Sequence, residues 1–226
     1  MKNLILLHGA MGSAQQLTKL AELLQTNYKV YPFTFSGHGG KAFQSDFSMQ
    51  SFVTELLAFV QTESLQGALV FGYSMGGYVA LTAEQQHPGT FSQIMTLGTK
   101  FHWTPEGATK ESAMLKPEII SEKVPAYAKA LEAEHGETWK TLCTRTAEMM
   151  VTLGNNPLLD AERLAEITIP VRIGLGDRDK MVTLDETVSA YRALQHGSMT
   201  MLPATPHPLD RVDAAYLANE LTAFFA

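Results

Sequence analysis

One serine stands where a buried strand would turn sharply into a helix. It is Ser74, within the stretch Gly72-Tyr73-Ser74-Met75-Gly76-Gly77. The apolar run 68–71 is typical of a buried strand, and residues 78–84 are typical of a helix. A sharp turn between them holds its central residue in a strained conformation, and the flanking glycines let neighbouring backbone approach closely. A hydroxyl displayed there, at a helix N-terminus, can act as a nucleophile when a base reaches it.

Side chains able to serve as that base and its partner follow later apolar segments. Asp177 and Asp179 follow one strand-like segment, and His207 follows another. A histidine titrates near neutral pH and suits a general base, and a carboxylate can orient its ring. An earlier apolar segment runs into the turn 8–13. Because open α/β sheets bind ligands at the carboxyl ends of their strands, all these groups are expected at one edge.

Strand-like and helix-like segments alternate along the chain, which favours a parallel sheet with helices on both faces. The alternation is interrupted from about residue 100 to residue 167, where helical patterns occur without a convincing strand. A chain of 226 residues can bury one sizeable core, so a single domain is expected.

With these four motifs in this order, the chain resembles the α/β-hydrolase superfamily from residue 2 to its C-terminus. The resemblance implies an α/β fold with a sheet of about six mostly parallel strands and helices on both faces. Residues 1–99 and 168–226 would form the hydrolase core. Residues 100–167 would form a helical lid over the active site.

The resemblance also implies a catalytic triad. Ser74 matches the nucleophile, His207 the general base, and Asp179 the carboxylate that orients the histidine. Asp179 is preferred to Asp177 because family members commonly have Gly-x-x-Asp after this strand, which corresponds to residues 176–179. Pro206 stands where family members usually have glycine.

The oxyanion hole and the substrate pocket are also expected by this resemblance. The backbone N–H groups of Ala10 and Met75 would form the oxyanion hole, with Met11 as the alternative to Ala10. Apolar candidates for the pocket are Met11, Phe101, Trp103 and Met149. Methionine and aromatic side chains suit an apolar substrate group, but the same side chains could simply pack the lid onto the body.

Composition excludes several classes of protein. With 45% hydrophobic and 18% charged residues, the chain is typical of a globular enzyme. A net charge of −6 without a basic stripe argues against nucleic acid and anionic membranes as partners. One cysteine, Cys143, excludes an internal disulfide and favours a reducing, cytoplasmic location. We expect no metal and no cofactor, because the sequence holds no metal-ligand cluster or phosphate-binding loop.

The predicted function is a serine hydrolase that cleaves a small ester or thioester through an acyl-enzyme. Two alternatives keep the fold: a carbon–carbon bond hydrolase or lyase, and a small-ligand signal receptor that retains the triad. The enzyme hypotheses imply a small-molecule substrate, and the receptor would bind a small ligand under the lid and present the lid to a partner.

Overall fold

The computed structural model describes all of residues 1–226. Its strands form one sheet in the order β2-β1-β3-β4-β5-β6, and each neighbouring pair is parallel. The strands are β1 (Lys2–Leu7), β2 (Tyr28–Phe33), β3 (Ala68–Tyr73), β4 (Phe91–Leu97), β5 (Val171–Gly176) and β6 (Gly197–Leu202). The predicted sheet of about six mostly parallel strands is confirmed.

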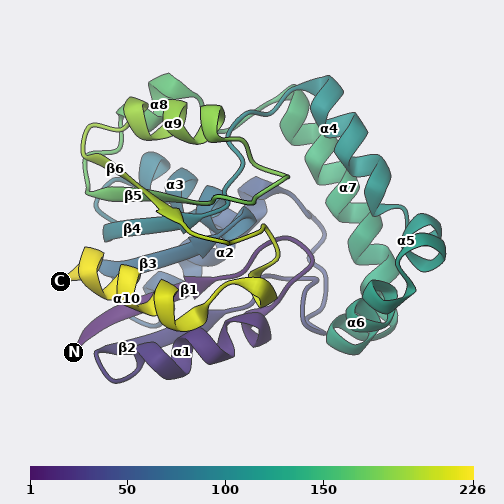
Figure 1. The fold of residues 1–226 in the computed structure, drawn as a ribbon, viewed down its shortest axis with the longest axis horizontal. Helices are drawn as coiled ribbons and strands as arrows, with labels where there is room; N and C mark the ends of the chain where they lie inside the picture. Colours follow the sequence, from purple (N-terminus) through teal and green to yellow (C-terminus); the bar gives the residue numbers. More distant parts are fainter.

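Helices cover both faces of this sheet (Figure 1). They are α1 (Thr18–Leu24), α2 (Met49–Thr62), α3 (Met75–Gln86), α9 (Leu184–Ala193) and α10 (Ala214–Phe225). In β1, Leu4 and Leu6 belong to the buried cluster that includes α1 and α10, whereas Ile5 and Leu7 belong to the cluster that includes α2, α3 and α9. Successive strand residues point to opposite faces, so a sheet covered on both sides requires the continuous apolar run seen in the sequence.

Helices and no strand lie between β4 and β5. They are α4 (Pro105–Ser112), α5 (Pro117–Lys123), α6 (Pro125–His135), α7 (Trp139–Asn155) and α8 (Ala161–Ala165), with short 3-10 turns η2 (Ala113–Leu115) and η3 (Gly136–Thr138). Three of these helices begin at a proline, which fits a first helical turn because its N–H would have no partner there. Figure 1 shows α4 to α7 gathered beside the edge at which the strands end.

Helix boundaries differ from the prediction at both ends of the chain. The helical pattern of residues 14–25 predicts one helix, but the structure divides it into η1 (Ala14–Leu17) and α1. The helical pattern of residues 209–225 also predicts one helix, but the structure divides it into η4 (Leu209–Arg211) and α10. The Asp213 carboxylate accepts the N–H of Ala215 at 2.9 Å and of Tyr216 at 3.1 Å, so it caps a new helix. No helix of the structure combines the length and apolar character needed to cross a membrane.

Candidate active site

Ser74 occupies the junction of β3 and α3. Its backbone has φ 50° and ψ −115°, a conformation that costs a non-glycine residue about 1–3 kcal/mol. The junction is tight, since a Cβ on Gly76 would lie 2.7 Å from the carbonyl oxygen of His8. Ser74 N–H donates to Leu97 O at 2.8 Å, and Ser74 O accepts from Thr99 Oγ1 at 3.0 Å. The end of β4 therefore holds the strained turn through both its N–H and its C=O.

His207 and Asp179 form a buried pair at the same edge. His207 Nδ1 lies 2.7 Å from Asp179 Oδ2, and the two side chains are 11% and 2% exposed. Asp179 Oδ1 accepts the N–H groups of Met181 and Val182 at 2.8 and 2.9 Å. Burial raises the pKa of Asp179, but the hydrogen bond from His207 and the backbone donors outweigh it, so this pKa lies below its usual value. Asp179 is therefore a carboxylate, His207 carries a proton on Nδ1, and Nε2 can accept another.

Asp177 lies apart from this pair. It is exposed, and its Oδ1 accepts the N–H of Thr205 at 2.9 Å. Hydrogen bonds from the Ala204 and Thr205 backbone lower the pKa of Asp177 below its usual value. In the structure, therefore, His207 contacts Asp179, the residue preferred from the sequence, and not Asp177.

The end of β4 also brings His207 toward the Ser74 turn. Gly98 follows β4 with φ 62°, and a Cβ there would lie 3.2 Å from His207 Cε1 and 3.4 Å from Asp179 Oδ2. The Tyr73 hydroxyl, one residue before Ser74, donates to the carbonyl oxygen of His207 at 2.7 Å. No hydrogen bond joins Ser74 Oγ to His207 Nε2. Without substrate, such bonds are often long or poorly aligned.

The backbone of residues 9–12 lies directly beside Ser74. A Cβ on Gly9 would lie 3.2 Å from Ser74 Cβ. The Ala10 N–H donates no hydrogen bond within the protein. Met75 is the first residue of α3, where N–H groups have no intrahelical acceptor. Two such donors beside a nucleophile can stabilise an oxyanion.

Comparisons with known proteins agree with this architecture. The sequence matches the profile of the Alpha/beta hydrolase family over residues 4–219. The chain belongs to this family. Lipase 3 of Moraxella sp. (strain TA144) is 24% identical over 246 residues, which cover 98% of this chain and 76% of that protein. This alpha/beta hydrolase is therefore an enzyme whose relatives include proteins named as lipases.

Solved structures share the fold of this hydrolase. A putative lipase from Acinetobacter baumannii AYE superposes with a TM-score of 0.83 at 21% identity, covering 99% of this chain and 83% of that one. The 2-hydroxy-6-oxo-6-phenylhexa-2,4-dienoate hydrolase of Rhodococcus sp. strain RHA1 superposes with a TM-score of 0.80 at 18% identity, covering 99% and 90%.

The four apolar residues predicted for the pocket of the hydrolase have different surroundings. Met149 is 5% exposed and lies in the main core, and Met11 is 4% exposed and packs with the helices of residues 113–143. Phe101 and Trp103 are half-buried against the main core. Trp103 Nε1 donates to Lys100 O at 3.2 Å. Met11 and Met149 therefore have packing contacts, while Phe101 and Trp103 keep exposed surface that a substrate could meet.

The other histidines of the hydrolase differ from His207. His8 and His38 are buried, and burial lowers the pKa of His8 to about 4 and that of His38 well below its usual value. His87, His102 and His196 are exposed. No group of three or more His, Cys, Asp or Glu side chains is arranged to hold a metal ion.

The sequence interpretation missed Tyr73 and Gly98 as supports of His207. A tyrosine in a buried strand signals that its hydroxyl needs a partner, but the sequence does not identify that partner. A glycine directly after a strand signals a positive φ, and again its neighbour comes from elsewhere in the chain.

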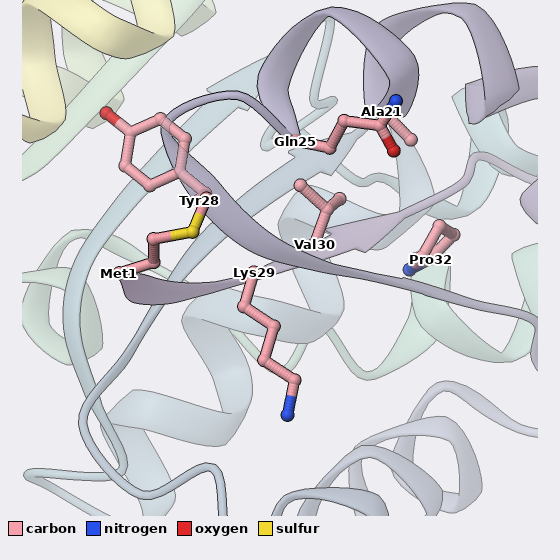
Figure 2. Close-up of a pocket in the computed structure, with 7 residues that line it drawn as sticks. All are labelled: Met1, Ala21, Gln25, Tyr28, Lys29, Val30 and Pro32. Atoms are coloured by element: carbon pink, nitrogen blue, oxygen red, sulfur yellow. The ribbon is translucent and has the colours of Figure 1, made fainter.

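A separate surface hollow of about 590 Å³ lies far from the triad candidates in the sequence and on another edge of the sheet (Figure 2). Its lining residues are Met1, Ala21, Gln25, Tyr28, Lys29, Val30 and Pro32. All but Met1, which precedes β1, come from α1, its C-terminal cap Gln25 and the outermost strand β2, and they include none of the predicted site residues.

Proposed function

We propose that this protein is a serine hydrolase that cleaves a small carboxylic ester or thioester through a Ser74-linked acyl-enzyme. The observation that carries the proposal is the buried 2.7 Å His207–Asp179 pair packed against Gly98, next to the strained Ser74 turn. A strained backbone conformation of this kind persists only where surrounding contacts hold it, and such conformations are more frequent at functional sites.

The chemistry follows from the proton positions. His207 Nε2 takes the hydroxyl proton of Ser74 as Oγ attacks the substrate carbonyl carbon, and the carbonyl oxygen becomes an oxyanion. The N–H groups of Ala10 and Met75 stabilise that charge. Asp179 stabilises the imidazolium, which then protonates the departing alcohol or thiol.

Water completes the cycle. His207 removes a proton from a water molecule, whose oxygen attacks the acyl carbon of the Ser74 ester. The second tetrahedral intermediate collapses, Ser74 Oγ regains the proton from His207, and a carboxylic acid is released. The net reaction consumes one water and needs no cofactor.

An ester is favoured over other bonds by the relatives. Lipase 3 and the putative lipase are both named as lipases, and each of them alone aligns with nearly the whole of this chain. We propose that residues 100–167 act as the lid, because helices α4 to α7 of this segment stand beside the carboxyl edge of the sheet (Figure 1). Ser74 directly follows β3 at that edge. Phe101 and Trp103, half-buried where this segment leaves β4, would contact an apolar acyl group. We place the enzyme in the cytoplasm, as its single cysteine suggests.

Carbon–carbon bond hydrolysis is the second candidate. One solved structure with a TM-score of 0.80 is named as a hydrolase of a 2-hydroxy-6-oxo-hexadienoate, and it shares 18% identity. A substrate of that kind carries a carboxylate, which basic side chains near the site would have to bind. Lys100, the basic residue closest in sequence to Phe101, is already paired with Glu111 at 2.9 Å.

The decisive experiment is steady-state hydrolysis of chromogenic esters of increasing acyl length, with Ser74→Ala as the blank. We expect turnover that depends on Ser74 and shows an optimum in chain length, while the unfolding midpoint of Ser74→Ala stays within a few degrees of wild type. Full activity in Ser74→Ala would refute the mechanism. Negligible wild-type turnover of all esters, with cleavage of a ring-fission dienoate, would favour the second candidate.

A further inference from the structure

The loop that carries Ala10 is tied to a helix that lies far away in the sequence. His135, at the end of α6, donates from Nε2 to Met11 O at 3.0 Å, although 124 residues separate them. The neighbouring Glu134 accepts the hydroxyl proton of Ser13 at 2.6 Å across 121 residues. Helix α6 therefore holds this loop at two points.

The hydrogen-bond partners define the tautomer of His135. The ring is buried, with only 2% of the residue exposed. The N–H of Gly39 donates to His135 Nδ1 at 2.9 Å, so that nitrogen carries no proton. The ring is then neutral with its proton on Nε2, where it meets the Met11 carbonyl. One imidazole thus joins α6, the loop with Met11 and the loop with Gly39.

Two peptide planes pass this restraint on to Ala10. In the Met11–Gly12 peptide, the C=O accepts from the imidazole, and the N–H of Gly12 donates to Gly9 O at 3.2 Å. Gly9 O also accepts from His8 Nδ1 at 2.7 Å. The C=O and N–H of a trans peptide point in opposite directions within one plane. Holding Gly9 O therefore fixes the direction of the Ala10 N–H.

Met11 itself needs this support. Its φ is 62°, in the left-handed region, which costs an L-residue other than glycine about 1–2 kcal/mol. Its side chain packs in a buried cluster with Trp139 and Cys143 of α7. The packing holds the side chain, but only the His135 bond holds the carbonyl. Without it, the Met11–Gly12 peptide can rotate toward an ordinary conformation, and Gly9 O then keeps only its hydrogen bond from His8 Nδ1.

We propose that His135 is a positioning residue of the oxyanion hole, which fixes the Ala10 N–H beside Ser74 through the Met11–Gly12 peptide. The inference rests on the proposed function, since the direction of this N–H matters to the rate only if an oxyanion forms there. His135 touches neither Ser74 nor the substrate and acts through the backbone. It also couples α6 to the oxyanion loop, so the lid segment and the hole are assembled together.

Two substitutions of nearly equal size separate this role from a merely structural one. In His135→Gln the amide reaches the position of Nε2 and keeps a donor for Met11 O. In His135→Asn the amide lies near the position of Nδ1 and keeps only an acceptor for Gly39 N–H. His102→Gln is the matched control, because His102 is an exposed histidine of the same segment.

The readout is kcat and KM for the best ester, at a temperature where melting curves show each variant folded. Losing an oxyanion donor altogether costs about 10²–10³ in kcat, so a donor that is only misdirected should cost about tenfold. We expect kcat of His135→Asn to fall about tenfold or more with KM unchanged. The kcat of His135→Gln should stay within about threefold, and His102→Gln should match wild type. Equal kcat in the Asn and Gln variants, or a change in KM alone, would overturn the inference.

A second assay separates failure of this inference from failure of the proposed function. Phosphonylation of Ser74 by a fluorophosphonate needs the nucleophile and the oxyanion donors but no particular ester. A wild-type enzyme that neither hydrolyses esters nor becomes labelled would refute the proposed function and this inference with it. Rapid wild-type labelling, with equal rates in both His135 variants, would refute this inference alone.

The wild-type protein supplies a test that does not depend on how the variants fold. Ring ¹⁵N chemical shifts of His135 at neutral pH should report the neutral tautomer protonated on Nε2. A ring protonated on Nδ1 could not accept the Gly39 N–H, and that result would overturn the assignment.

Discussion

Neutralising Asp179 without changing its size tests the triad directly. In Asp179→Asn, one amide oxygen can still accept the N–H groups of Met181 and Val182 that Oδ1 accepts at 2.8 and 2.9 Å. The amide nitrogen then faces His207 Nδ1 in place of Oδ2. Two donors cannot pair, so the ring moves its proton to Nε2, the atom that must receive the proton of Ser74. The fold stays intact and the base is disabled.

The size of the effect follows from the isolation of the pair. The Asp179 side chain is 2% exposed, so water cannot replace the lost acceptor. The equivalent change in serine proteases lowers kcat by about 10⁴-fold, which corresponds to about 5 kcal/mol. We expect a loss of about 10³–10⁴ in kcat here, with KM nearly unchanged. Asp177→Asn should lower kcat less than about fivefold, because an amide oxygen can still accept the N–H of Thr205.

The assay compares both variants with wild type in steady-state ester hydrolysis and in thermal unfolding. Equal losses in the two variants, or a larger loss at Asp177, would refute the assignment of Asp179. Acid titration of stability gives an independent check. The folded-state pKa of Asp179 is lowered, so its stabilisation is present above the ordinary aspartate pKa near 4 and is lost as pH falls through the lowered value. The unfolding midpoint of wild type should therefore fall more steeply in acid than that of Asp179→Asn.

Three further predictions concern the supports of the site. Tyr73→Phe removes the donor to the His207 carbonyl, and it should lower the free energy of unfolding by about 1 kcal/mol and kcat by about tenfold. Urea unfolding measures the first effect and ester kinetics the second. An unchanged kcat would count against a role of this contact in catalysis. Gly98→Ala and Gly89→Ala both force alanine into a positive φ, so each should lower the free energy of unfolding by about 1–2 kcal/mol. Only the Cβ added at Gly98 meets His207, so only Gly98→Ala should also lower kcat. Burial lowers the pKa of His8 to about 4, so the unfolded chain binds a proton there that the folded chain does not. The contribution of neutral His8 to the free energy of unfolding is fully present above pH 6.5, and about 3 kcal/mol of that free energy is lost as the pH falls toward 4. The slope of unfolding free energy against pH should be shallower in His8→Gln, and equal slopes would contradict this.

The fold could be predicted from the sequence because each strand signals its own environment. The apolar run in β1 fits a strand covered on both faces, and Leu4 and Ile5 indeed lie in different core clusters. Pro105, Pro117 and Pro125 each stand at the first position of a helix, which the sequence analysis did not specify. The C-terminal helix was predicted too long because a capping aspartate within an apolar pattern, Asp213, interrupts the helix without changing its periodicity. Local sequence signals therefore predict which helices and strands form more reliably than they predict where each one begins.

The triad candidates could be predicted from the sequence, but the residues that hold them in position could not. Ser74, Asp179 and His207 each follow a strand of one parallel sheet, so the topology alone brings them to one edge. The groups that hold them are joined by contacts that no local pattern encodes. Tyr73 meets the His207 carbonyl across 134 residues, and His135 meets the Met11 carbonyl across 124.

These long-range contacts decide how well the site can work. A nucleophile, a base and two N–H donors supply the chemistry, but their rate depends on positions held to within fractions of an ångström. In this protein the holding bonds go to backbone carbonyls: those of His207, Met11 and Gly9. Every residue has a backbone carbonyl, so the residue type does not indicate which carbonyl accepts such a hydrogen bond. Substitution of the donors Tyr73, His135 and His8 should therefore change kcat while the triad side chains remain intact.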